Sequence, residues 1–149
     1  MSNVRNISVG VVAIASALIA SYEGLREKAY LDPVGIPTIC YGSTSGVRIG
    51  DVKTHGDCKK LLDKEVAVAT NAVDRLVLVP LKENEWAAYT SFVYNVGEGN
   101  FAKSTLLKLL NAGDHEGACK QLTKWVYAKG VKLNGLVRRR TAERQLCLS

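Results

Sequence analysis

The sequence predicts a mostly α-helical fold of the α+β class, with a single small β region near the amino terminus. Helices are indicated because apolar residues recur at three- and four-residue spacing over most of the 149 residues. A β region is indicated over residues 31–50, where Pro33, Pro37 and several glycines interrupt short runs of β-prone residues. The length fits one domain with a substantial core.

The composition is typical of a globular protein, and the cysteines and histidines argue against a structural zinc site. Apolar residues make up 47% of the chain and charged residues 23%, which is ordinary for a globular protein. The net charge of +6 suits any anionic polymer or surface without selecting one. There are four cysteines but no C-x-x-C pair, and the only histidines are His55 and His115, so we predict no structural zinc site.

The first segment, residues 6–22, carries no charge and combines seven Ile, Val or Leu with eight Ala, Ser or Gly. As a helix it would span about 25 Å, a little less than the ~30 Å hydrocarbon layer. Three interpretations compete. They are a cleaved signal peptide with Ala15-Ser16-Ala17 as its A-x-A site, a permanent anchor, and a buried core helix.

The following elements are predicted from the spacing of apolar residues and from the capping and turn residues between them. A helical pattern runs from Leu18 to Tyr30, and the β region follows. A long amphipathic helix begins at Thr54, which with Asp57 resembles a capping box, and continues to Leu76 before Pro80.

The second half of the chain is predicted to be helical throughout. A helix around Trp86 to Val96 should end at a loop over residues 97–100, and Ser104 should cap a helix that continues to Leu110. A helix near residues 119–127 and a basic helix over residues 136–147 complete the prediction. Trp86, Phe92, Phe101 and Trp125 are expected in the core.

Catalytic chemistry is expected from carboxylates, because the sequence has no G-x-S-x-G, Walker or H-E-x-x-H motif. Glu23 lies at the end of an otherwise apolar helical face, a setting that favours the protonated acid. Asp32 follows nine residues later at a turn, where polar groups can keep it ionised, and Thr38 adds a hydroxyl. One acid and one ionised carboxylate across a cleft suit glycoside hydrolysis, although by spacing alone both could be ordinary solvated carboxylates.

The segment YEGLREKAYLDPVGIPTICYGST (residues 22–44) resembles the active-site signature of phage lysozymes, the endolysins of glycoside hydrolase family 24. Further matching blocks are SFVYNVGEGNFAKSTLLKLLN (residues 91–111), Trp125 and GLVRRRTAERQL (residues 135–146). The similarity covers nearly everything after Leu18.

This resemblance implies a lysozyme-like fold, in which a small β-containing lobe and a helical lobe are joined by a long helix and enclose a cleft. It implies hydrolysis of the β-1,4 bond between N-acetylmuramic acid and N-acetylglucosamine in peptidoglycan. Glu23 would be the general acid, and Asp32 with Thr38 would activate water on the opposite face, giving inversion. Tyr94, Asn95 and Thr105 match saccharide-binding positions.

The resemblance implies neither a metal nor a cofactor, and we expect a monomer that does not bind nucleic acid. The basic run Arg138-Arg139-Arg140 is instead interpreted as a solvated helix face with packing salt bridges. Two positions depart from the family pattern: Cys40 replaces a Gly, and Ser43 replaces a His that could support Glu23.

The amino-terminal segment resembles that of signal-anchor-release endolysins. Residues 1–22 would be a signal anchor that also supplies the first helix, and residues 18–149 would be the lysozyme domain. The chain would be exported to the host inner membrane, held there through residues 6–22 facing the periplasm, and later released into the periplasm to act in host cell lysis.

Export would allow disulfides. Cys40 with Cys58 would join the β region to the long helix, and Cys119 with Cys147 would join the last two helices. Alternatively, Cys40 exchanges partners on release as a redox switch. The rival to the whole assignment is a non-catalytic, membrane-tethered module that binds the cell wall or nucleic acid.

Overall fold

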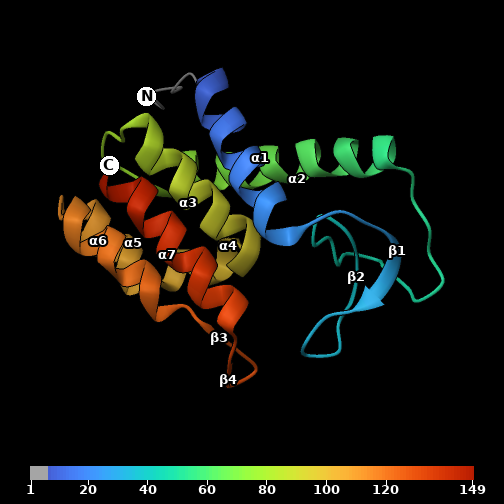
Figure 1. Cartoon of the computed structure of the whole chain (residues 1–149). Helices are drawn as coiled ribbons and strands as arrows, with labels where there is room; N and C mark the ends of the chain where they lie inside the picture. Colours follow the sequence, from blue (N-terminus) through green and yellow to red (C-terminus); the bar gives the residue numbers. More distant parts are fainter. Residues whose placement is uncertain (1–6) are drawn as a thin grey trace.

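A small β lobe and a larger helical lobe are connected by the long helix α2 in the computed structural model, which describes residues 7–149 (Figure 1). The expected lysozyme-like α+β fold is therefore confirmed. In chain order the elements are α1 (Val9–Glu23), β1 (Arg26–Leu31), β2 (Pro37–Cys40), α2 (His55–Leu76), α3 (Glu83–Val96), α4 (Glu98–Lys103), α5 (Thr105–Asn111), α6 (His115–Gln121), β3 (Tyr127–Ala128), β4 (Val131–Lys132) and α7 (Asn134–Leu148).

The first helix, α1, begins at Val9 and ends at Glu23. Ser8 caps its start, since its hydroxyl oxygen accepts a hydrogen bond from the Val11 N–H at 3.2 Å. At its end Gly24 turns to a φ of 67° and donates its N–H to the Ala20 carbonyl. The predicted helix from Leu18 to Tyr30 is therefore wrong beyond Glu23. The left-handed glycine stops the helix, and residues 26–31 pair with a second strand instead.

The β lobe is built on the antiparallel pair β1 and β2, whose register shifts between Arg26 and Tyr30. Two isolated bridges extend it, from Lys28 to Val52 and from Ile39 to Ser43. Its small core contains Ile39, Cys40 and Cys58. This lobe holds the turn between the strands at one side of a cleft.

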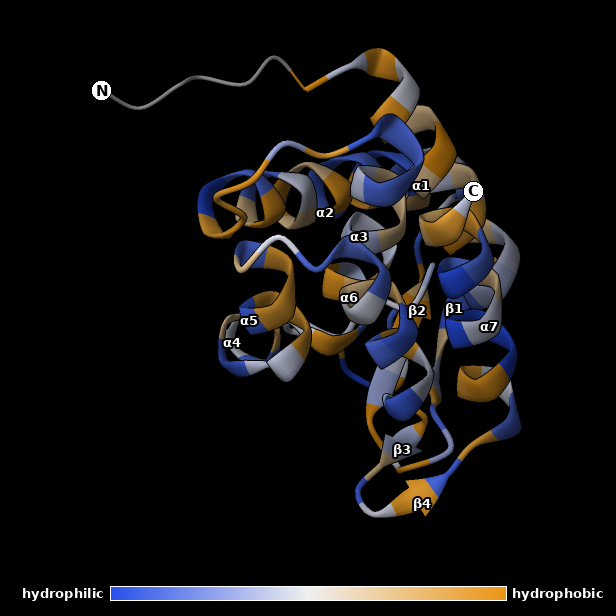
Figure 2. Ribbon diagram, turned by 90° about the vertical axis from the view of Figure 1, so that its left-hand side faces the viewer, coloured by the Kyte–Doolittle hydropathy of each residue, from blue (hydrophilic) through white to orange (hydrophobic). Residues whose placement is uncertain are grey.

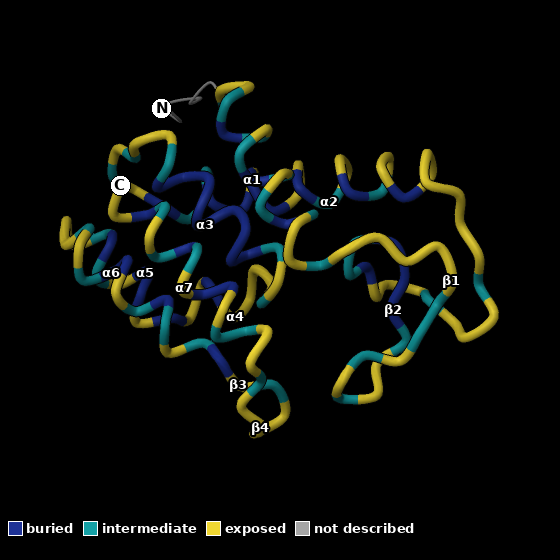
Figure 3. Tube along the Cα trace, in the orientation of Figure 1, coloured by how far each residue is buried: buried dark blue, intermediate teal, exposed yellow. Residues whose placement is uncertain are grey.

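Helix α2 begins as predicted, because the Thr54 hydroxyl oxygen accepts a hydrogen bond from the Asp57 N–H at 3.1 Å. Its carboxyl-terminal half enters the helical lobe and packs on α3. Helix α3 is the centre of that lobe: it contacts α1, α2 and α7, and most of its residues are buried (Figure 3). The lobes are thus connected by this long helix and by the short segment between α1 and β1.

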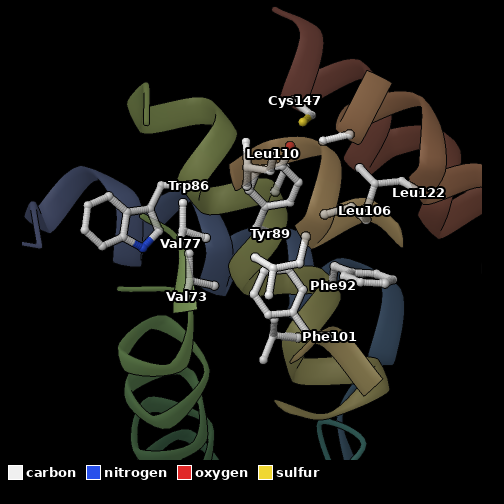
Figure 4. Packing of buried hydrophobic residues seen from close by; sticks show 14 of the residues in the cluster. Val73, Val77, Trp86, Tyr89, Phe92, Phe101, Leu106, Leu110, Leu122 and Cys147 are labelled. Atoms are coloured by element: carbon white, nitrogen blue, oxygen red, sulfur yellow. The ribbon is translucent and has the colours of Figure 1, made fainter. Parts of the chain in front are cut away.

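The main core surrounds α3 (Figure 4). Phe92 and Phe101 meet edge to face with ring centroids 6.3 Å apart, and Trp86 is buried as expected. Helix α1 contributes Val11 to this core and Ile19 to a second cluster with Leu62 and Val66 of α2. The apolar first helix is therefore an integral layer of the folded domain.

Two predictions in the second half need correction. Residues 98–100 are not a loop but the first turn of α4, because Gly97, with a φ of 89°, makes the whole turn by itself. The helix expected near residues 119–127 ends at Gln121, and a 3-10 turn (Leu122–Lys124) and the β3–β4 hairpin follow. The helix from Ser104 and the last helix are confirmed.

Helix α1 is coloured mainly as hydrophobic, whereas α7 mixes hydrophilic and hydrophobic turns (Figure 2). Among the helices of residues 7–149, none combines the length and the apolar character needed to cross a membrane.

Candidate active site

Glu23 is placed at the cleft by the end of α1. It is the last helical residue, and 19% of its side chain is exposed. The backbone of Gly42, from the β lobe, lies directly against the Glu23 carboxylate, where a methyl group would overlap the carboxylate atoms. One carboxylate is thus held between a helix end and a glycine turn.

Asp32 is fixed by the turn that joins β1 to β2. Its Oδ1 accepts hydrogen bonds from the Val34 N–H at 2.9 Å and the Ile36 N–H at 2.8 Å. Its own backbone closes the same turn, since its N–H donates to the Ile36 carbonyl at 3.0 Å. Both side-chain bonds are donated to the carboxylate, which is the arrangement expected of an ionised group in a rigid turn.

A cleft of about 1000 Å³ is lined by Glu23, Asp32, Thr38, Tyr94 and Asn95 together. Five of the predicted site residues therefore face one space. Thr38 is 4% exposed and donates its hydroxyl to the Ile36 carbonyl at 2.8 Å. The predicted site residue Thr105 lies elsewhere: it is exposed in the first turn of α5 and is not among the residues that line the cleft.

The charges of both carboxylates affect the pKa of Tyr30 on β1. Burial is the largest cause that raises the pKa of its phenol, followed by the negative charge of Glu23. The positive charge of Arg26 lowers this pKa, and the charge of Asp32 raises it by a smaller amount. The Arg26 guanidinium lies 4.3 Å from the centre of the Tyr30 ring. Tyr30 lies within electrostatic reach of both carboxylates, which supports their shared environment.

Across the cleft, Tyr94 of α3 donates its hydroxyl to the Tyr41 carbonyl of the β lobe at 2.7 Å. Burial, and then the charge of Glu65, raise the pKa of Tyr94, so its phenol is neutral and can donate this bond. At the cleft mouth, Lys129 of the β3–β4 hairpin donates to the Val34 carbonyl at 3.2 Å. These two hydrogen bonds join the lobes near the site.

The arginine run is the part of the site that sequence reasoning missed. Arg138 is exposed, as predicted for a solvated face, but Arg139 and Arg140 are only 3% and 0% exposed. The Arg139 Nη1 donates to Glu23 Oε1 across the two ends of the chain. The available signal was the helical spacing of Arg139, Arg140 and Glu143, which places three charges on one helix face.

Both departures from the family pattern lie near this site. Cys40 has a φ of 61°, a left-handed conformation that explains why glycine is usual at this position. Ser43 is 3% exposed, and its backbone pairs with Ile39 in both directions at 2.9 Å. Its short side chain lacks the imidazole that was expected to support Glu23.

Both expected disulfides are present, Cys40–Cys58 and Cys119–Cys147. In the described part of the chain, the one group of potential metal ligands is Glu85, Cys119 and Cys147, within 4.8 Å of one another. Both of its sulfurs are bonded to each other, which leaves a single carboxylate as a free ligand.

Comparisons with known proteins show the family and the fold of the chain. The sequence model of the family described as Phage lysozyme matches residues 20–143. A SAR-endolysin of Bacteriophage PS119 is 44% identical over 149 aligned positions, covering 95% of this chain and 89% of that protein.

Among solved structures, an endolysin from the Escherichia coli O157:H7 phage FAHEc1 has a TM-score of 0.81 and 30% identity, covering 100% of this chain and 97% of that one. The active form of the P1 phage endolysin Lyz has a TM-score of 0.78 and 28% identity, with 97% and 94% covered.

Proposed function

Because this chain belongs to the phage lysozyme family and is therefore a glycoside hydrolase, we propose that it is an endolysin acting on the glycan of bacterial peptidoglycan in host cell lysis. The bond cleaved is the β-1,4 bond between N-acetylmuramic acid and N-acetylglucosamine, with inversion. The observation that carries this proposal is the single cleft that Glu23, from a helix end, and Asp32, from a strand turn, line together.

Glu23 is the general acid that protonates the leaving glycosidic oxygen. Gly42 and Arg139 hold the carboxylate from two sides and restrict its rotamers, so its position is fixed. The setting is not the wholly apolar one expected from the sequence, because the Arg139 guanidinium contacts the carboxylate. Asp32 is the base, and its turn presents an ionised carboxylate to the cleft. An inverting enzyme needs room for a water molecule between its two carboxyl groups.

Thr38 places that water with Asp32. Its hydroxyl proton is committed to the Ile36 carbonyl, so its oxygen lone pairs remain free to accept a hydrogen bond from the water, whose proton passes to Asp32. In the groove, Asn95 receives a bond from Arg140 Nη2 on its Oδ1 at 2.9 Å, which leaves its amide N–H groups free to donate to a saccharide.

The decisive experiment is lysis by the Glu23→Gln variant. Loss of general acid catalysis should reduce activity by about 10²-fold or more, measured as turbidity loss of chloroform-treated Gram-negative cells. Glu27→Gln, an exposed acid on β1, is the matched control and should retain parental activity. If Glu23→Gln lyses cells as fast as the parent, Glu23 is not the general acid and the proposed mechanism is wrong.

The amino-terminal segment is, in this proposal, a releasable membrane tether. Residues 7–22 of it form the start of the described chain, and residues 1–6 lie outside the described residues. The support is the composition of the segment, weakly apolar as a span yet able to pack as α1, together with the SAR-endolysin name of the PS119 relative. Host export would place the tethered form on the periplasmic side of the inner membrane.

Release should depend on the membrane potential. Leaving the membrane would carry Arg5 and the terminal amine outward against an inside-negative potential, at about 2.3 kcal/mol per charge per 100 mV. We expect the protein in the membrane fraction of energised cells and, uncleaved, in the soluble fraction after an uncoupler. A shortened amino terminus in the mass spectrum of the soluble form would instead establish a cleaved signal peptide.

A further inference from the structure

A buried charge cluster lies behind Glu23 on α7. Arg139, Arg140 and Glu143 are 3%, 0% and 0% exposed. Glu143 Oε2 lies 3.3 Å from Arg139 Nε, and Glu143 Oε1 lies 2.8 Å from Arg140 Nε. Charges that are so fully removed from water persist only when they are paired, so these three side chains form one electrostatic unit.

Glu143 is the anion of this unit. Its Oε2 also accepts hydrogen bonds from the Ser91 hydroxyl of α3 at 2.6 Å and from Arg140 Nη2 at 3.4 Å. Every polar group around this carboxylate is a donor, so the bonding pattern is that of an ionised acid. Burial raises the pKa of Glu143, while Arg140, Arg139 and the Ser91 hydroxyl oppose that increase. Burial also lowers the pKa of Arg140, to about 10, which leaves it charged at neutral pH.

Arg139 connects this unit to the site. Its Nε faces Glu143 and its Nη1 donates to Glu23, so one guanidinium lies between two carboxylates. Its Nη2 donates to the Ser91 carbonyl at 3.0 Å, which fixes the plane of the group. Two guanidinium groups face two carboxylates here, so when Glu23 carries its proton Glu143 is the one remaining anion of the cluster.

We propose that Glu143 is a positioning residue of the reaction, which holds Arg139 in place and takes up enough of the cluster's positive charge for Glu23 to carry its proton. The inference rests on the proposed role of Glu23 as general acid. Without Glu143, Glu23 would be the sole carboxylate opposite two buried guanidinium groups, whose charge opposes the protonated form that a general acid needs.

The other groups around Glu23 do not supply this counter-charge. Tyr30 of β1 and Tyr94 of α3 are neutral phenols, and Asp32 and Glu65 approach from the β lobe and α2 within the open cleft. Water in the cleft screens those carboxylates, whereas Glu143 acts through a buried guanidinium. The charge balance of the buried part therefore depends on this residue.

The test is the pH profile of peptidoglycan hydrolysis at constant ionic strength. In Glu143→Gln, we expect the alkaline limb to move to lower pH by about one unit, a tenfold loss at a fixed pH on that limb with recovery in acid. The double variant Glu143→Gln with Arg140→Met removes one charge of each sign, and its alkaline limb should return toward the parental position. A purely structural role would lower activity equally at every pH, and the double variant would not restore it.

A milder pair of variants covers the case in which Glu143→Gln fails to fold. Ser91→Ala removes one donor to the Glu143 carboxylate and should shift the same limb in the same direction by a smaller amount. Thr90→Ala is the control, because its buried hydroxyl bonds Thr70 at 3.0 Å, away from the cluster. If Ser91→Ala keeps the parental pH profile, as Thr90→Ala should, the proposal is overturned. The proposed function fails separately, only if Glu23→Gln remains active.

Discussion

Gly42 sets the position of the proposed general acid through the absence of a side chain. Its φ is 81°, and the Glu23 carboxylate occupies the space where a Cβ atom would lie. The sequence alone did not single out this glycine, because the contact joins a helix end to a turn of the other lobe. The role of a glycine of this kind becomes visible only when both partners are placed in space.

Gly42→Ala should therefore reduce activity by more than its effect on stability explains. The left-handed backbone costs about 1 kcal/mol for any L-residue, but displacement of Glu23 should add at least a tenfold loss in lysis rate. Gly46→Ala is the matched control, since Gly46 has a φ of 68° and no atom within 4 Å of the added methyl. Comparing the two by thermal melts and turbidity loss separates backbone strain from the contact, and equal activity losses would exclude a specific role for Gly42.

Some candidate site residues could be selected from the sequence, and others could not. Glu23, Asp32 and Thr38 lie within one continuous motif, so the family resemblance selected them as candidates, whereas their spacing alone did not. Arg139 was interpreted as surface because a run of three arginines is usually solvated, and burial depends on what packs against the helix. The position of Thr105 beyond the cleft lining shows the same limit.

At the scale of the element, α1 has two kinds of alanine. Ala15 is fully buried against the rest of the domain, whereas Ala13 and Ala17 are exposed on the opposite face. A larger apolar residue at an exposed position leaves the folded domain intact, but it strengthens the same segment as a membrane span. Packing in the folded domain and insertion into the membrane therefore depend on different positions of this segment, and substitutions can affect one without the other.

Ala13→Leu with Ala17→Leu should trap the protein on the membrane. The folded enzyme, assayed after detergent extraction, should keep its specific activity, because both side chains face solvent in α1. Ala15→Leu should instead destabilise the folded domain by overpacking, by about 1–3 kcal/mol. Release of the double variant by an uncoupler at the parental rate would contradict the proposed tether.

The start of a helix was predictable where a capping residue marked it. The bounds of a strand were not predictable where pairing with a second strand determines them. Thr54 and Ser104 began helices where their side chains indicated. The amphipathic pattern after Glu23 suited a helix equally well, and only pairing with β2 made it a strand. The β3–β4 hairpin was missed because it has two residues per strand, too short for a periodic signal.

At the scale of the whole molecule, each lobe has its own covalent link. Cys40–Cys58 lies within the β lobe and the start of α2, and Cys119–Cys147 joins α6 to α7. Neither disulfide crosses the cleft, so the lobes are joined by α2, by the short connection from α1 to β1 and by non-covalent contacts. The disulfides should thus affect the stability of each lobe more than the geometry between them.

Replacing Cys119 and Cys147 by Ser should lower the free energy of unfolding by about 3 kcal/mol, with kcat unchanged at temperatures where the variant is folded. The pair Cys40→Gly with Cys58→Ser should cost about 1 kcal/mol less than Cys40→Ser with Cys58→Ser, since glycine relieves the left-handed φ of residue 40. Urea titrations of all three variants measure these differences. Equal losses for the two Cys40 variants would show that the backbone there relaxes without the disulfide.

The contact between Glu23 and Arg139 joins residues 116 positions apart, near the two ends of the chain. During translation Glu23 is made before Arg139. Until residue 139 has been added, no nascent chain holds both partners, and a fragment that ends before it lacks the group that contacts the proposed general acid. We therefore expect fragments that end before Arg139 to be inactive in lysis.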